Sequence, residues 1–209
     1  MDNDAMLYAF DSGDLELRSF VKRGGASVIH GRFPYGKRAV LSDGGRRGRP
    51  RKEVIAPRAF SYRVNIPEED IHLLLGHDYG KPLASRASNT LKLTDTEDAL
   101  TFEAKILPEI AETTHGRDAL ALINSGLAIG LSPGFRLPPK RAVATPERVE
   151  NEGHNPEQGE HNAVIRTVLS ALLYELSIVT RPAYSEAQVE ARSWQVKLPQ
   201  QTGSHLRWR

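Results

Sequence analysis

Short segments in which apolar and polar residues alternate recur along this chain, and they restrict it to a fold built mainly from β-strands. Residues 100–106 give the clearest alternation, which is the period expected of a strand with one buried face. Leu91–Leu93 and Leu100–Leu107 are joined by the polar turn Asp95–Asp98. This arrangement predicts a hairpin.

Other apolar segments are short and lie between turn-forming residues, which is typical of further strands. The expected strands are Ala5–Phe10, Leu15–Val21, Ala26–Arg32, Leu127–Leu131 and, as a pair, Ala163–Val179, while an apolar run at Ile71–Leu75 leads into His77. The clearest helix is Thr114–Ser125, which Thr114 is expected to cap and Gly126 to stop. Pro57–Tyr62 predicts a helical turn, and Pro67 predicts a helix start. Many strands with few helices favour an α+β fold, mainly antiparallel, with a sheet or barrel and helices packed outside.

Two polar stretches are expected to be surface loops. Phe33–Lys52 is rich in Gly, Arg and Pro, and Pro138–Asn162 is polar and contains prolines, which is a composition typical of loops. We expect one domain over residues 1–185, with mobile loops at about 36–52 and 138–162, and a C-terminal tail over residues 186–209.

The composition excludes several classes of protein. The chain has no cysteine, so disulfides and thiol catalysis are excluded. Its net charge of +2, from 28 basic and 26 acidic residues, gives no general field that would attract nucleic acid. The longest apolar runs are too short to span a bilayer, and the acidic start Met1–Asp4 does not match a secretory signal. Motifs for phosphate loops, zinc and dinucleotides are missing, so we expect no cofactor and no metal.

The one concentration of charge is the basic cluster Arg46–Lys52. Such a cluster is able to contact nucleic acid or an acidic protein surface. No aromatic residues lie between its cations as stacking platforms for bases. A solvated loop is therefore the favoured interpretation, and a nucleic-acid partner is not expected.

Three separate segments carry the groups that a serine hydrolase needs. Gly76–Asp78 contains the imidazole of His77, Gly130–Phe135 contains the hydroxyl of Ser132, and Tyr174–Val179 contains a carboxylate. A serine hydroxyl becomes a nucleophile when a base takes its proton, and a third group fixes the tautomer of that base. These segments predict a catalytic site only if the fold brings them together.

The nucleophile segment differs from the common hydrolase turn at one position. Ser132 follows the expected strand and is flanked by glycines, but Pro133 follows it directly and has no N–H. The usual turn places an oxyanion donor on that residue. The donor must then come from elsewhere, and the candidates are the amides of Gly134 and Phe135 and the guanidinium of Arg136.

The carboxylate of the third segment is Glu175, which lies in an apolar run. Burying a carboxylate is costly unless it is paired, and His77 is the candidate partner. The alternation of a strand puts Glu175 on one face with Leu173 and Ser177, and it leaves open whether that face is buried.

His115 and Asp78 are rival candidates for the third group. Asp78 is the weaker of these, because neighbouring side chains on a strand point in opposite directions and it directly follows His77.

Taken in order, these segments resemble the prohead (procapsid maturation) serine protease of tailed bacteriophages, a relative of the herpesvirus assemblins. The resemblance covers about Val28–Tyr184, and the matching pieces are Phe33–Gly36, Glu53–Phe60, Gly76–Asp78 with Pro82–Ser85, the Ser132 segment and Glu175–Ala183. It implies a closed β-barrel surrounded by a few helices. It also implies Ser132 as nucleophile, His77 as base and Glu175 as third member, where the assemblins use a second histidine.

The resemblance further implies a biological role. The protein is expected to be an endopeptidase that cleaves the scaffolding region of the major capsid protein precursor, and itself, inside the assembling prohead in the host cytoplasm. It implies a homo-oligomer, no membrane, and the tail over residues 186–209 as the self-cleaved region. The alternative is a catalytically inactive scaffold or capsid-binding protein of the same fold.

Overall fold

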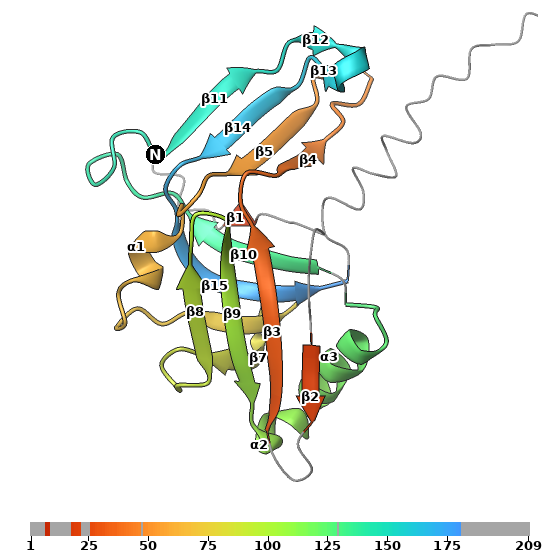
Figure 1. Ribbon diagram of the computed structural model, residues 1–209, viewed down its shortest axis with the longest axis vertical. Helices are drawn as coiled ribbons and strands as arrows, with labels where there is room; N and C mark the ends of the chain where they lie inside the picture. Colours follow the sequence, from red (N-terminus) through yellow and green to blue (C-terminus); the bar gives the residue numbers. More distant parts are fainter. Residues whose placement is uncertain (1–6, 9–17, 22–25, 47, 129, 181–209) are drawn as a thin grey trace, which may run out of the picture.

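The computed structural model describes residues 7–8, 18–21, 26–46, 48–128 and 130–180. Within these residues the protein is mostly β-sheet with a few short helices (Figure 1). Three larger sheets and one two-stranded sheet are present in the described parts. The prediction of a mainly β fold is therefore confirmed.

Sheet A contains the three segments to which His77, Ser132 and Glu175 belong. Its five strands lie in the order β1, β10, β15, β6, β7. Their bounds are Leu7–Tyr8, Gly130–Arg136, Leu172–Val179, His72–Leu75 and Asp78–Ser85. The β15–β6 pair is parallel and the other pairs are antiparallel.

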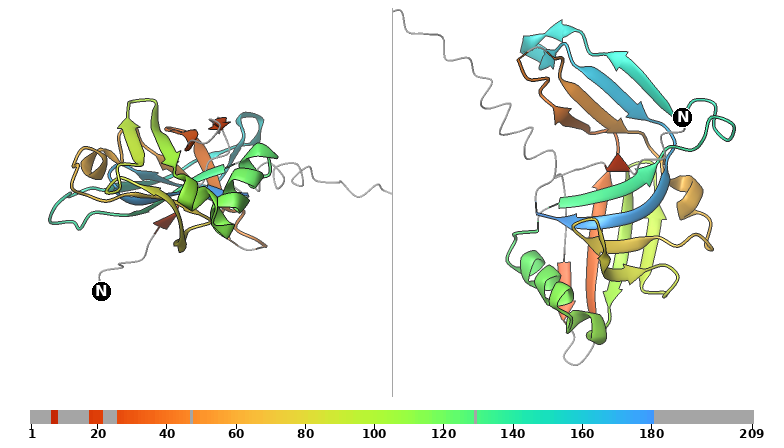
Figure 2. Two further views of the ribbon diagram at one scale, coloured as in Figure 1. Left: turned by 90° about the horizontal axis from the view of Figure 1, so that it is seen from below. Right: turned by 180° about the vertical axis from the view of Figure 1, so that it is seen from behind.

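Sheet B packs against sheet A and has the strand order β2, β3, β9, β8. The strands span Arg18–Val21, Ser27–Pro34, Ala99–Ile106 and Leu91–Asp95. The predicted hairpin is confirmed, because β8 and β9 pair antiparallel. Figure 2, in its view from behind, shows β10 and β15 running across the strands of sheet B.

The hydrophobic core lies between these two sheets. Leu100 of sheet B and Leu73 and Leu176 of sheet A are fully buried within it. Phe60, from the turn before α1 (Ser61–Val64), packs edge-to-face on Phe135 with ring centroids 5.7 Å apart. Large apolar and aromatic side chains of this kind dominate the stabilisation of a core.

Sheet C forms the upper part of the molecule in Figure 1. Its strands, in the order β11, β14, β5, β4, span Glu147–Asn151, Val164–Val168, Arg51–Ile55 and Arg38–Ser42. Next to it lie β12 (His154–Asn155), the 3₁₀ turn η1 (Pro156–Gln158) and β13 (Glu160–His161).

Two of the expected loops therefore contain strands, and that part of the prediction is wrong. β4 and the first two residues of β5 fall in residues 33–52, and β11 to β13 fall in residues 138–162. The physical reason is that these strands present many polar side chains to solvent: in β11, four of the five residues are exposed. Such strands are held by pairing with a neighbour and not by an apolar face of their own, so they lack the pattern that identifies a strand.

The basic cluster is partly used inside sheet C. The guanidinium of Arg49 donates to the carbonyl of Asn162 at 2.8 Å, and Lys52 forms an ion pair with Glu152. These two cations are bonded to neighbouring segments, and Lys52 lies on β5 itself, so at these positions the cluster is part of the sheet and not the solvated loop that was expected.

The longest helix in the described residues is α3, Thr114–Asn124, close to the range predicted. Its cap is Thr113 and not Thr114, because the Thr113 hydroxyl accepts from the amide of Gly116 at 3.1 Å. A short helix, α2 (Pro108–Ala111), precedes it. None of the described helices has the length and apolar character needed to cross a membrane.

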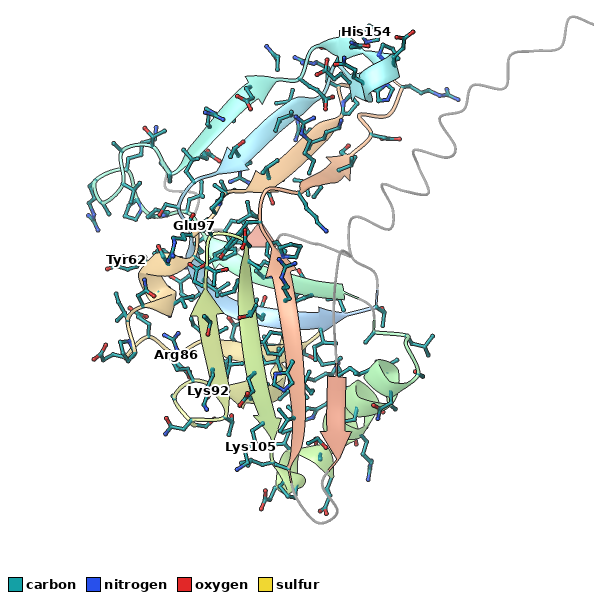
Figure 3. The ribbon with its side chains drawn as sticks, viewed as in Figure 1. Tyr62, Arg86, Lys92, Glu97, Lys105 and His154 are labelled. Carbon is teal, nitrogen blue, oxygen red and sulfur yellow. The ribbon has the colours of Figure 1, made fainter. Side chains whose placement is uncertain are left out.

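The helix expected to start at Pro67 is not present, since residues 67–69 form turns and a bend. The guanidinium of Arg86, labelled in Figure 3, donates to the carbonyls of Val64 and Ile66, each at 2.8 Å. These carbonyls are thus satisfied by a side chain from elsewhere in the chain, which fixes the segment in an irregular conformation.

The expected closed barrel is wrong, because no sheet closes on itself in the parts of the chain that the structure describes. Closure requires the last strand to pair with the first. At the outer edge of β7, the carbonyl of Pro82 instead contacts Nε2 of His115 at 3.0 Å. The amide of Ser85 donates to the Thr90 hydroxyl at 3.0 Å. Side chains therefore occupy the edge groups that a closing strand would need.

Candidate active site

Ser132 lies in the middle of β10, and not at the end of a strand as its sequence context suggested. In the ladder between β10 and β15, Ser132 is opposite Ser177 and Gly134 is opposite Glu175. Opposite residues of such a ladder point to the same face of the sheet. Ser132, Ser177 and Glu175 therefore share one face of sheet A.

A bulge in β15 decides which face Glu175 occupies. Phe135 is opposite Leu173 while Gly134 is opposite Glu175, so Tyr174 has no opposite residue. A bulge of this kind reverses the alternation for the residues beyond it. Leu173 consequently points into the core with Leu176, whereas the sequence had put Leu173 on the face of Glu175.

Gly134 is required by the carboxylate of Glu175. A Cβ atom on Gly134 would lie 2.0 Å from Oε1 of Glu175, well inside van der Waals contact. The second glycine of the Gly-x-Ser-x-Gly string therefore makes room for the acid on the neighbouring strand.

His77 reaches the same face from the turn between β6 and β7. Leu75 pairs with Asp78, so the connection has two residues, Gly76 and His77, with φ of 68° and 60°. Positive φ at both positions is what the type I′ hairpin turn requires. For a residue with a side chain this conformation costs roughly 1–2 kcal/mol, and such strain is often found at functional sites.

Two hydrogen bonds hold this turn against β15. The amide of Gly76 donates to the carbonyl of Ile178 at 3.0 Å, and the amide of His77 donates to the hydroxyl of Ser177 at 2.8 Å. The strained turn is thus fixed by the strand that carries the acid.

The side chains of His77, Glu175 and Ser177 form one hydrogen-bonded network. Nδ1 of His77 lies 2.7 Å from Oε1 of Glu175, and the hydroxyl of Ser177 donates to Oε2 of Glu175 at 2.7 Å. Both carboxylate oxygens are therefore bonded, which offsets the cost of burying a residue that is only 1% exposed. Because a carboxylate only accepts, Nδ1 carries the ring proton and Nε2 of the neutral ring is left as an acceptor.

Ser177 is the member of this network that the sequence analysis missed. It lies two residues after Glu175, which is the spacing that puts two strand residues on one face. The sequence thus carried a signal for it, but nothing in the sequence indicated that its hydroxyl bonds both the acid and the backbone of the histidine.

The rival candidates for the third group are bonded elsewhere. The carboxylate of Asp78 accepts from the amide of Gly80 at 2.8 Å and pairs with Lys81 at 3.1 Å. His115 contacts the carbonyl of Pro82.

The three candidate oxyanion donors lie further along β10. Gly134 and Phe135 are paired with β15 on one side and with β1 on the other. The guanidinium carbon of Arg136 is 5.3 Å from the ring centroid of Tyr174. No contact in this arrangement singles out one of the three, so their role stays a prediction.

The site is largely buried: Ser132 is 0% exposed, whereas the side chain of His77 is 18% exposed. Partial exclusion of water strengthens the interactions between charges and dipoles. No group of three or more His, Asp or Glu side chains that could hold a metal ion occurs among the described residues.

Comparison with known proteins identifies the family. A family model described as caudovirus prohead serine protease matches residues 45–201, a range that includes Ser132, His77 and Glu175. No curated protein and no solved structure shows a significant match to the chain. The match covers most of the chain, so the protein belongs to the caudovirus prohead serine protease family, whose members act in the maturation of tailed-phage proheads.

Proposed function

We propose that this protein is an endopeptidase that uses Ser132 as nucleophile, His77 as general base and Glu175 as the group that orients the base. The observation that carries the proposal is the 2.7 Å contact between Nδ1 of His77 and Oε1 of Glu175. It occurs on the face of sheet A to which Ser132 also belongs. In this proposal the three residues take the roles found in serine proteases, namely nucleophile, imidazole and buried acid.

In this mechanism the proton moves between Ser132 and Nε2 of His77. As the hydroxyl oxygen attacks the scissile carbonyl, Nε2 takes the hydroxyl proton and later gives it to the leaving amine. Glu175 keeps the other ring proton on Nδ1 and stabilises the positive charge that forms on the ring. The second hydrogen bond of Glu175, from Ser177, keeps the carboxylate from rotating away from the ring.

For the negative charge on the carbonyl oxygen we propose the amides of Gly134 or Phe135, or the guanidinium of Arg136, as donors. The two amides belong to a strand paired on both sides. Arg136 is four residues from Ser132 on the same strand, which corresponds to ~13 Å between their Cα atoms. A guanidinium donor would therefore have to reach back along β10.

The substrates we propose are the scaffolding region of the capsid protein precursor and the protein's own tail over residues 186–209. The family membership supports a capsid substrate. Confinement of the protease and its substrate in one shell raises their effective concentration, so a low intrinsic turnover would be sufficient.

The decisive experiment replaces Ser132 by alanine. Loss of the nucleophile of a serine triad lowers turnover by roughly 10⁴- to 10⁶-fold, so Ser132→Ala should stop cleavage of the capsid precursor while the circular dichroism spectrum stays that of a folded protein. Ser125→Ala, at the exposed end of α3, is the matched control and should cut normally.

Labelling with a fluorophosphonate separates an enzyme from an inactive capsid-binding protein. The wild-type protein should react, and mass spectrometry should find the label on Ser132. Cleavage by Ser132→Ala at the wild-type rate would refute the proposal, and failure of the wild-type protein both to react and to cut would favour the non-enzymatic alternative.

A further inference from the structure

A cavity of about 310 Å³ lies beside the outer edge of sheet A. Strands β6 and β7 contribute His72, Pro82 and Ser85, and the segment around α2 contributes Leu107 and Ile110. Its volume is near the lower end of the ~300–1,000 Å³ range of ligand pockets, which suits one side chain better than a cofactor.

Two rows of opposite residues run across one face of sheet A, from the candidate active site on β10 to this cavity at β7. Across β10, β15, β6 and β7, the first row is Ser132, Ser177, Leu74 and Pro82. The second row is Gly134, Glu175, His72 and Ser85. Adjacent strands lie ~4.8 Å apart, so Pro82 is ~14 Å from Ser132, a span that an extended peptide covers in about four residues. The cavity is therefore within reach of a peptide bound at Ser132.

The hydroxyl groups around the cavity are bonded to one another. Ser88 bonds Ser85 at 3.1 Å and Thr90 at 2.7 Å, and the Thr90 hydroxyl also accepts from the amide of Ser85. Their hydrogen-bonding capacity is largely used within this turn. A side chain bound in the cavity would therefore contact mainly the carbon atoms of these three residues.

The remaining lining is apolar or already paired. Pro82, Leu107 and Ile110 contribute alkyl groups. Nε2 of His72 lies 3.4 Å from a carboxylate oxygen of Asp70, and its ring packs on Tyr79 with centroids 5.8 Å apart. A charged side chain would lose its hydration in this cavity without gaining a partner, which is unfavourable, whereas an apolar side chain would gain burial.

We infer that this cavity is a specificity pocket that takes an apolar side chain of the substrate, three or four residues from the scissile bond. This inference rests on the function proposed for Ser132, because that residue fixes where the bond is cut. Burying such a side chain contributes about 1.5–3 kcal/mol, which corresponds to roughly a 10- to 100-fold preference over a residue without one.

The first test reads the preference from cleavage of a proteome-derived peptide library by the full-length protein. Wild-type cleavage sites should be enriched in Leu, Ile, Val, Met or Phe three or four residues from the cut, on one side of it. Ile110→Gln should reduce kcat/KM by roughly tenfold or more on peptides with those residues, while peptides with glycine there are cut as before.

Ile110→Leu is the matched control, because it preserves the volume and apolar character of the wall and should keep the wild-type preference. A second variant, Ser88→Phe, fills the cavity from an exposed turn and should select against large side chains. The inference is overturned if wild-type cleavage shows no apolar preference at those positions, or if Ile110→Gln and Ile110→Leu give the same profile.

The second test measures binding without catalysis, in the full-length Ser132→Ala protein. N-acetyl-leucinamide should shift the methyl NMR signals of Leu107 and Ile110, and N-acetyl-aspartamide should leave them unchanged. Equal effects of the two probes, or none from either, would overturn the apolar pocket. If the leucine probe binds but the wild-type protein cuts nothing, the function proposed for Ser132 fails while the apolar character of the cavity stands.

Discussion

One strand glutamate is buried in sheet A and one in sheet C, and their carboxylates differ in how they are hydrogen-bonded. Glu175 of sheet A has both oxygens hydrogen-bonded, one to His77 and one to Ser177. Glu53 of sheet C is only 3% exposed, and its Oε2 accepts from Arg166 at 3.1 Å. Its other oxygen, Oε1, has no hydrogen-bond partner.

Burial alone therefore does not distinguish the acid that we propose for catalysis from an acid in a structural ion pair. Burial raises the pKa of Glu53 to about 7, even though the nearby Arg166 acts in the opposite direction. Glu53 is held by a neighbouring charge within a structural sheet. Glu175 is held by two directed hydrogen bonds, one with the imidazole of His77 and one from the hydroxyl of Ser177.

The largest expected effect comes from replacing the acid of sheet A by its uncharged analogue. Glu175→Gln keeps the shape but offers Nδ1 of His77 an amide that is able to stabilise the wrong tautomer. We expect kcat on the capsid precursor to fall by roughly 10⁴-fold, the size seen for the same change in a serine triad. Glu53→Gln, the matched change in sheet C, should leave kcat unaltered. Equal losses in the two variants would remove the distinction between the sheets.

The next prediction concerns the stability of sheet C as a function of pH. A carboxyl with a raised pKa binds its proton more tightly in the folded state, so its stabilisation is complete below its ordinary value of 4.5 and is lost as the pH rises to about 7. For Glu53 the loss is roughly 3 kcal/mol. Glutamine resembles the protonated form, so Glu53→Gln should be more stable than the wild-type protein at pH 8, with a smaller difference at pH 5.

Urea unfolding at the two pH values measures this effect as a change in the free energy of unfolding. Glu103→Gln is the control, because Glu103 is an exposed carboxylate that lies 3.9 Å from Lys92, and it should give nearly the same difference at both pH values. A Glu53→Gln protein that is less stable than the wild type at pH 8 would mean that the pair with Arg166 outweighs burial.

The elements that could be predicted from the sequence are those in which one face is apolar, because a buried face leaves a regular pattern in the chain. The hairpin of β8 and β9 follows from alternation, and helix α3 follows from an apolar stripe with a stop at Gly126. Two strands of sheet C, at residues 38–42 and 147–151, were missed because they are edge strands with mostly exposed side chains, each held by backbone pairing with a single neighbour. Pairing of that kind leaves no period in a single sequence.

The candidate site shows the same division between local and distant causes. Ser132, His77 and Glu175 could be chosen from the sequence, because a hydroxyl, an imidazole and a carboxylate each have a defined chemistry. The bulge at Tyr174, which puts Glu175 and Leu173 on opposite faces, could not be predicted, since it is set by the register between two strands. The expected barrel was wrong for a related reason: contacts such as that between Pro82 and His115 decide whether an edge stays open.

A third prediction compares two crowded glycines. A Cβ atom would meet Oε1 of Glu175 at 2.0 Å in Gly134→Ala and Cε1 of Phe102 at 2.1 Å in Gly31→Ala. The first should push the acid away from His77 and lower kcat by about 10²-fold, the effect of a shift of ~1 Å in a catalytic group. The second should lower the melting temperature and leave the kcat of the folded protein unchanged. An unchanged kcat in Gly134→Ala would show that Glu175 tolerates displacement.

The smallest expected effect comes from the hydroxyl that links the acid to the histidine turn. Ser177→Ala removes the 2.7 Å bond to Glu175 and the 2.8 Å bond from the amide of His77, but it leaves the contact between the ring and the carboxylate. A hydrogen bond to a charged group contributes ~1.5–3 kcal/mol. Only part of this free energy acts on the geometry of the ring, so we expect kcat to fall by about tenfold with KM unchanged.

Ser177→Thr retains the hydroxyl and should recover most of the loss. Thr167→Val removes a buried hydroxyl from sheet C, and should change only the stability. If Ser177→Ala also changes stability alone, the network on sheet A has the same purely structural role as the ion pair on sheet C.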